Sequence, residues 1–149
     1  MTSNPKSWKV GIAVAEFNEE ITAALLKCCE DELLKSGVQK KNIRVIWTPG
    51  AYELPFVARQ IALKKKVDAV ICLGCVIKGQ TSHDIFVAGW AALGIGQVSL
   101  ETGVPTLFGV LTPKNLAQAK ERSRPGSLNR GKEAAAAALR MIALKKKGV

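Results

Sequence analysis

Four short apolar segments alternate with longer segments of helical periodicity, and this alternation constrains the fold more than any other feature. The apolar segments are "WKVGIAVAEF", "NIRVIWT", "VDAVICLGCVI" and "VPTLFGVLT", at residues 8–17, 42–48, 67–77 and 104–112. Apart from Asp68 near its start, the third is apolar along its whole length, which is typical of a strand covered on both faces. Strands that alternate with helices predict an α/β protein with a four-stranded parallel sheet.

The intervening segments have the signals of helices. In residues 19–36 one face carries apolar side chains, and Gly37 is the expected stop. Pro55 suits the first turn of a second helix that runs to about Lys65, and residues 85–103 predict a third helix that several glycines weaken. We expect Thr112 to cap a helix that begins at Pro113, residues 122–131 to form a loop, and residues 132–147 to form the last helix.

The composition is that of a soluble globular protein. With 149 residues, 48% apolar and 23% charged, the chain predicts a single domain over residues 1–149. No uninterrupted apolar run reaches the length that a membrane span needs, so we expect no membrane partner. The first ten residues lack an apolar core followed by a cleavage site, which predicts a cytoplasmic protein.

The net charge of +10 comes partly from lysine runs at residues 40–41, 64–66 and 145–147. Each run lies where a helix should end or a strand begin, and cations are favourable at helix C-termini. A basic surface can also attract nucleic acid. No nucleic-acid-binding motif accompanies the lysines, and 5% aromatic residues are too few for a base-stacking platform, so we expect no nucleic-acid partner.

The four cysteines include a C-x-x-C pair, Cys72 and Cys75, which in other contexts indicates redox chemistry or zinc. The pair lies inside the third apolar segment, which reads as a buried strand. The other two, Cys28 and Cys29, are adjacent and complement a tetrahedral site poorly. We therefore interpret the cysteines as buried apolar residues and expect no metal.

In a parallel sheet, ligands bind at the carboxyl ends of the strands, where "EFNEE", "TPGAYELP", "VIKGQTSHD" and "GVLTPKN" should meet. "GQTSHD" leads into a helix, so its backbone N–H groups, with Gly79 and the Thr81 hydroxyl, can hold a phosphate. His83 is the only histidine and would lie beside that phosphate. It can transfer protons near neutral pH or simply cap its own helix.

Three further residues each allow a structural and a functional interpretation. Phe17 could belong to the core or stack on a flat heterocycle at the exit of the first strand. Glu53 could cap its turn or accept hydrogen bonds from a ligand. Arg122 ends a helix, where a cation is favourable in any case, and it could also clamp a phosphate.

Taken together, these segments resemble a known family. The motifs "EFN", "PGAYELPFVA", "LGCVIKGQTSHD", "FGVLT" and "QAKERSRPGSLNRGKEAA" have the order and spacing of 6,7-dimethyl-8-ribityllumazine synthase, from about residue 9 to 144. The resemblance implies a flavodoxin-like three-layer αβα sandwich and the penultimate step of riboflavin biosynthesis. The enzyme would condense 5-amino-6-(D-ribitylamino)uracil with 3,4-dihydroxy-2-butanone 4-phosphate, release phosphate and water, and need no metal or organic cofactor.

The resemblance also implies the roles of individual residues. His83 would transfer protons, and Gly79, Gln80, Thr81 and Arg122 would bind the phosphate. Binding of the ribitylaminouracil would involve Phe17, Ala51, Tyr52, Glu53, Cys75, Val76, Ile77 and Phe108. Sites in this family lie between subunits of a homopentamer, and in many members pentamers form an icosahedral shell. Phe108, Arg122 and Arg130 would then reach a neighbour's site, and riboflavin synthase is a candidate partner.

Some positions depart from the family pattern. Glu16 stands where Arg is common, Gln80 where Glu or a small residue is common, and Asp84 where an aromatic residue is frequent. Arg130 replaces the usual Lys, and residues 125–128 differ from the usual loop. None of these removes a residue that the chemistry needs. The alternative is a binding protein on the same scaffold that holds a flavin or lumazine without catalysis, which predicts the loss of His83 or Arg122; both are present.

Overall fold

The computed structural model describes residues 4–64 and 66–149, and its elements alternate as the sequence predicts. The strands are Val10–Ala15 (β1), Ile43–Thr48 (β2), Ala69–Cys75 (β3) and Thr106–Leu111 (β4), each inside its predicted segment. They pair in parallel in the order β2-β1-β3-β4. β3 is buried along its whole length, which agrees with its continuous apolar sequence.

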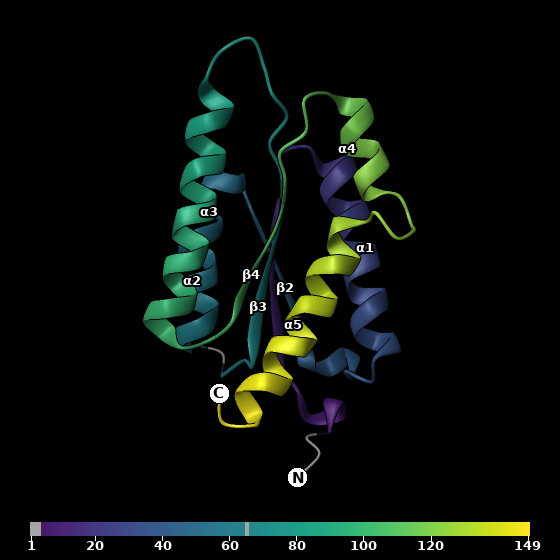
Figure 1. Ribbon diagram of the computed structural model, residues 1–149, viewed down its shortest axis with the longest axis vertical. Coiled ribbons are helices and arrows are strands. Elements are labelled where there is room, and N and C mark those ends of the chain that lie inside the picture. Colours follow the sequence, from purple (N-terminus) through teal and green to yellow (C-terminus); the bar gives the residue numbers. More distant parts are fainter. Residues whose placement is uncertain (1–3, 65) are drawn as a thin grey trace.

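Helices cover both faces of this sheet (Figure 1). Helices α1 (Glu19–Lys35), α4 (Leu116–Ser123) and α5 (Arg130–Lys146) lie on one face, and α2 (Leu54–Lys64) and α3 (His83–Thr102) lie on the other. Short 3₁₀ turns occur at Pro5–Ser7 (η1), Lys40–Asn42 (η2) and Ala51–Glu53 (η3). The predicted three-layer αβα sandwich of the flavodoxin-like type is therefore confirmed.

Each layer has its own apolar core. On the first face, Leu25 of α1 and Ile142 of α5 pack against Ile12 and Ile71 of the sheet. The inner side of α5 is largely alanine, which lets the helix approach α1 closely. The approach is closest at Gly131, where an added Cβ atom would overlap the carbonyl oxygen of Leu25. On the other face, the core is formed by Ala13, Ala58, Ile61, Val70, Ile95 and Val98, with further residues of the same elements.

Two predicted helix starts are wrong. The sequence predicts a cap at Thr112, but α4 begins at Leu116, and the Asn115 side chain accepts from the backbone N–H of Gln118 at 2.8 Å. The Gln118 side chain accepts in return from the N–H of Lys114, so reciprocal bonds place the start here. Likewise, α5 begins at Arg130 behind an Asn129 cap, inside the loop predicted for residues 122–131.

Helix α3 runs unbroken from His83 to Thr102 in spite of its glycines. Of the described residues, only this helix is long and apolar enough to cross a membrane by length and composition, with a mean hydropathy of 1.3. The sequence predicts no segment able to span a membrane, and that expectation is corrected by the length and the mean hydropathy of α3. The same helix packs on the sheet through Ala91, Gly94, Ile95 and Val98, and 22% of its apolar window is buried.

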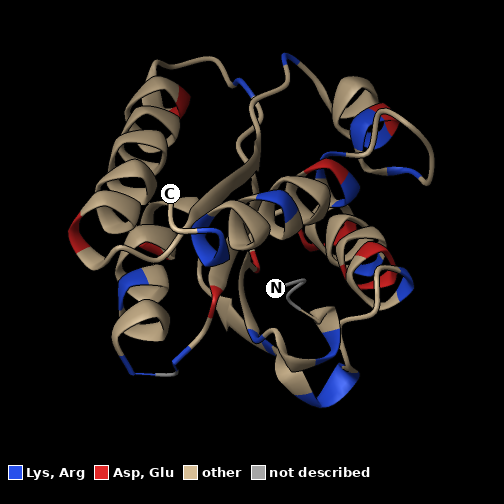
Figure 2. Ribbon diagram, turned by 60° about the horizontal axis from the view of Figure 1, so that its bottom comes forward, with Lys and Arg blue, Asp and Glu red and all other residues tan. Residues whose placement is uncertain are grey.

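Basic residues mark the ends of α2 and α5 and the start of β2, among other places (Figure 2). Lys64 ends α2, Lys145 and Lys146 lie in the last turn of α5, and η2 carries Lys40 and Lys41 before β2. Lys65, part of one predicted run, lies outside the described residues. Lys146 pairs with Asp68 at 3.2 Å, which connects the end of α5 to the start of β3. The lysine runs therefore occupy the predicted places.

Candidate active site

A cavity of about 720 Å³ lies at the carboxyl ends of β1, β2 and β3. In the sheet, β1 lies between β2 and β3, and the chain runs from β1 to β2 on one side before it crosses to β3 on the other. Open α/β sheets bind ligands at such a switch point, and the cavity lies there. Its lining residues come from four segments: Phe17, Asn18, Gly50, Ala51, Tyr52, Glu53, Cys75, Val76, Ile77, Gly79, Thr81, His83, Asp84, Phe86 and Val87.

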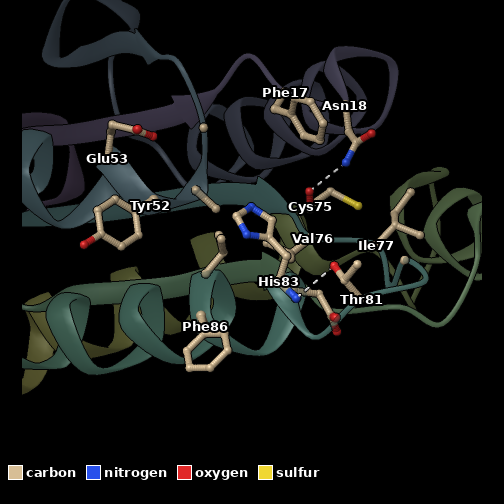
Figure 3. Close-up of a pocket in the computed structure, with 15 residues that line it drawn as sticks. Phe17, Asn18, Tyr52, Glu53, Cys75, Val76, Ile77, Thr81, His83 and Phe86 are labelled. Carbon is tan, nitrogen blue, oxygen red and sulfur yellow. Dashed lines mark hydrogen bonds between the residues drawn. The ribbon is translucent and has the colours of Figure 1, made fainter.

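The exits of the first three strands are held together by hydrogen bonds. The backbone N–H groups of Glu16 and Phe17 donate to the carbonyls of Thr48 and Pro49, at 2.7 and 3.1 Å. The Asn18 side chain donates to the carbonyl of Cys75 at 2.8 Å and so spans the switch point (Figure 3). Because the Glu16 contact is made by the backbone, the departure from the usual Arg leaves it intact.

Phe17 is a wall of the cavity and not a core residue. Its side chain is 70% exposed, which rules out the core interpretation. A large exposed ring at a cavity edge is well placed to stack on a flat heterocycle. Phe86, which the sequence did not single out, forms another exposed aromatic part of the lining.

The turn after β2 forms another side of the cavity. Gly50 is extended, Ala51–Glu53 form η3, and the N–H of Glu53 donates to the carbonyl of Gly50 at 3.3 Å. Tyr52 and Glu53 extend along one side of the cavity in Figure 3. The carbonyl of Tyr52 accepts a hydrogen bond from the indole Nε1–H of Trp90 on α3, at 3.0 Å.

The exit of β3 is anchored to that of β4. The N–H groups of Val76 and Lys78 donate to the carbonyls of Leu111 and Pro113, at 2.8 and 3.0 Å. Burial raises the pKa of the Cys75 thiol to about 11, so the thiol is neutral at physiological pH and contributes an apolar surface. Val76 and Ile77 complete this wall and are partly exposed.

The loop from Gly79 leads directly into α3. His83 is the first residue of that helix, its backbone N–H donates to the Thr81 hydroxyl at 3.3 Å, and its imidazole points into the middle of the cavity (Figure 3). Asp84 follows it, and its buried Oδ1 atom has no hydrogen-bond partner among the residues that the structure describes. The positive end of the helix dipole, the Thr81 hydroxyl and His83 thus occupy one corner of the cavity.

Four predicted site residues do not line this cavity. Gln80 lies in the loop between Gly79 and Thr81, while Phe108 lies on β4 at 41% exposure. Arg122 is in the last turn of α4, and Arg130 begins α5 and pairs with Glu133 at 3.2 Å. The cavity also contains residues that the sequence did not predict: Asn18, Gly50, Asp84, Phe86 and Val87. Asn18 offered a signal, because it directly follows Phe17 in the "EFN" motif.

The C-x-x-C pair does not form one site. Cys72 belongs to the core under α2 and α3, whereas Cys75 belongs to the core under α1 and α5. Residues three apart in a strand point to opposite faces, so the two thiols are separated by the sheet. Among the described residues, no group of three metal-binding side chains is brought together.

The family comparison agrees with this geometry. A family model described as 6,7-dimethyl-8-ribityllumazine synthase matches residues 7–146 of the 149-residue chain. The match includes the three strand-end segments that form the cavity, the segment that follows β4 and every predicted site residue. The chain therefore belongs to the 6,7-dimethyl-8-ribityllumazine synthase family, the transferases of riboflavin biosynthesis that condense a ribitylaminouracil with a butanone phosphate.

Proposed function

We propose that the cavity at the carboxyl ends of β1, β2 and β3 is where this lumazine synthase carries out its reaction. The observation that supports this most is the convergence of three strand-end segments on one cavity that combines exposed aromatic rings, a helix N-terminus and the only histidine. The 5-amino group of the pyrimidine attacks the ketone and water leaves. Phosphate is then eliminated, and the ribitylamino nitrogen closes the ring with loss of a second water.

The pyrimidine half of the cavity is assigned to the rings and backbone of three strand exits. Phe17 stacks on the heterocycle, because its ring is exposed at the cavity wall. Backbone groups of Cys75, Val76 and Ile77 bind the polar edge of the ring. The ribityl hydroxyls lie along the η3 turn, where Ala51, Tyr52 and Glu53 offer backbone groups and a carboxylate.

The phosphate half is assigned to the loop before α3. Gly79, Gln80 and Thr81 bind the phosphate at the helix N-terminus, where the dipole favours an anion. His83 lies beside this group and moves protons between the amine, the carbonyl and the leaving phosphate. An imidazole suits this work, because its ordinary pKa lies close to neutral pH.

The enzyme is assigned a homopentameric assembly with sites between subunits. The outer side of α3 exposes large apolar side chains, among them Ile85 at 65%, Leu93 at 68% and Leu100 at 88%. Apolar faces of this kind are typical of protein interfaces. In the pentamer, Phe108, Arg122 and Arg130, which do not line their own chain's cavity, reach the neighbour's, and Arg122 binds the phosphate.

Three finer proposals follow from family membership. Pentamers associate further into an icosahedral shell, as in many members of the family. Riboflavin synthase, which consumes the lumazine, is the proposed protein partner. The protein is cytoplasmic, where both soluble substrates are available. Each is tested separately, by sedimentation velocity, by co-purification and by cell fractionation.

The reaction is tested by mixing the purified protein with both substrates and following the fluorescence of the lumazine. The slow uncatalysed condensation is measured in parallel and subtracted. We expect a rate that saturates with each substrate. Tight binding of a lumazine or flavin without acceleration would contradict the assignment and indicate a binding protein on the same scaffold.

A further inference from the structure

Trp90 lies outside the cavity but is bonded to its wall. Its indole Nε1–H donates to the carbonyl oxygen of Tyr52 at 3.0 Å. The Trp90 ring is also tilted against the Tyr52 ring, with centroids 5.8 Å apart and an interplanar angle of 37°. Trp90 itself does not line the cavity, whereas Tyr52 does.

The bonded carbonyl belongs to a turn whose other hydrogen bonds are local and whose first residue, Ala51, is buried in the core under α2 and α3. Within the turn, the N–H of Glu53 donates to Gly50, and the N–H of Leu54 donates to Ala51. Those bonds are local and fix the shape of the turn, but not its distance from α3. The Trp90 bond joins residues 38 apart in sequence and, together with the packing of Ala51 in the core under α3, fixes that distance.

The other end of the connection is the helix that carries the histidine. Trp90 follows His83 by seven residues on α3, which places both on one side of the helix, with Phe86 and Val87 between them. Phe86 and Val87 line the cavity. The Trp90–Tyr52 bond therefore spans from the helix of the proton-transferring group to the turn assigned to the ribityl chain.

We propose that Trp90 is a positioning residue that holds the Ala51–Glu53 turn at the correct distance from α3 and thereby sets affinity for the ribitylaminouracil. This inference rests on the proposed assignment of the ribityl chain to that turn. The phosphate loop, Gly79 to Thr81, is on the far side of His83 and does not contact Trp90 through any bond in the described chain. Trp90 thus acts on one substrate and not on the other.

The test is Trp90→Phe, which keeps an aromatic ring and removes the N–H donor. We expect the KM for the ribitylaminouracil to rise about five-fold, the equivalent of about 1 kcal/mol for one neutral hydrogen bond. The KM for the butanone phosphate and kcat should stay within about two-fold, the ordinary scatter between related variants. Equal changes in both KM values, or no change, would overturn the proposal.

Trp47→Phe is the matched control. Trp47 lies on the edge strand β2 at 37% exposure, close to the 38% of Trp90, and it does not line the cavity. Its kinetics should equal those of the unchanged enzyme. Both variants are measured on material that sediments as the wild type does, so that a change in assembly is not mistaken for a change in the site.

Failure of the inference can be told apart from failure of the proposed function. If the wild type forms lumazine and Trp90→Phe leaves the pyrimidine KM unchanged, only the inference fails. If the wild type forms none, the function fails, and the dissociation constant of the lumazine product is measured for both proteins instead. A five-fold weaker product affinity in Trp90→Phe would support the positioning role, and equal affinities would overturn it.

Discussion

The two helical layers of this protein differ in what they leave exposed. In the described part of the chain, apart from the C-terminal Val149, every large hydrophobic side chain that is more than half exposed lies at Phe17 or on η3, α2 and α3. On α1, α4 and α5, the exposed apolar side chains are fewer and less exposed, such as Leu34 at 39% and Met141 at 41%. The layer of α1, α4 and α5, here the complete layer, keeps most of its apolar side chains buried within the chain. The layer of α2 and α3, here the open layer, presents an apolar outer face, the open face.

The cavity lies next to the layer with the exposed apolar face. Its walls include Tyr52, Phe86 and Val87 from the layer with the exposed face, so a neighbour that covers that face would also approach the cavity. Arg122 lies on α4, in the complete layer, away from its own chain's cavity. In the proposed pentamer, the complete layer of one subunit would serve the open layer of the next.

The largest effect is expected from a charge on the open face. Leu93→Glu places a carboxylate at a residue that is 68% exposed in the chain and does not line the cavity. If a neighbour covers this residue, burying the unpaired charge costs on the order of 3 kcal/mol per contact. We expect smaller species in sedimentation velocity and loss of lumazine formation. Met141→Glu, on α5, is the control and should assemble normally; equal behaviour of the two would contradict the comparison.

The next effect concerns the residues that two subunits are proposed to share. His83→Ala should slow turnover about a hundredfold, the scale of a lost general acid–base group, and leave assembly intact.

Arg122→Ala should raise the KM for the phosphorylated substrate more than that for the pyrimidine. Kinetics of the fluorescent product measure both.

Mixing those two variants sharpens the test. If each site takes His83 from one subunit and Arg122 from its neighbour, co-assembled 1:1 mixtures contain about a quarter of sites with both residues, by the statistics of a cyclic assembly. With the butanone phosphate well below its KM, where Arg122→Ala is slow, refolding the variants together should therefore restore activity above either one alone. No restoration, with mixed assemblies verified by mass spectrometry, would place both residues in the same subunit's site.

A moderate effect is expected inside the complete layer. Gly131→Ala adds a Cβ atom that would overlap the Leu25 carbonyl, so α5 must move away from α1, at a cost of about 2 kcal/mol of unfolding free energy. Gly96→Ala on α3 is the matched control, because in the described chain no atom beyond its chain neighbours and the nearby backbone of its own helix lies within 4 Å of its Cβ position. Denaturant unfolding measures both, and a Gly131→Ala protein as stable as the wild type would refute the close packing.

The smallest effect is a difference in thiol reactivity. Burial raises the pKa of Cys75 to about 11 and raises those of Cys28, Cys29 and Cys72 as well. Only Cys28 is partly exposed, so iodoacetamide at pH 8 should label it first. Labelling of Cys75 should rise as the pH approaches 11, because the thiolate is the reactive form. Peptide mass spectrometry measures each rate, and fast labelling of Cys72 in the folded protein would contradict its burial.

Much of the fold could be predicted because its signals are local. The apolar segments predict the four strands within a few residues, and Pro55 falls in the first turn of α2 as expected. The helix start predicted at Thr112 is wrong, since reciprocal side-chain bonds at Asn115 and Gln118 outweigh a favourable proline. Several possible helix starts lie within three or four residues of each other, and the sequence composition does not show which one forms the most stable cap.

The candidate site also has features that local sequence signals predict and features that they do not. By itself the sequence determined which segments end strands, and because parallel strands share one edge, those segments had to meet. Only the tertiary structure decided that Asn18 bonds to Cys75, 57 residues away, and that Trp90 bonds to Tyr52. These bonds join elements that local periodicity does not relate. They depend on how each helix docks on the sheet, which the packing of whole layers decides.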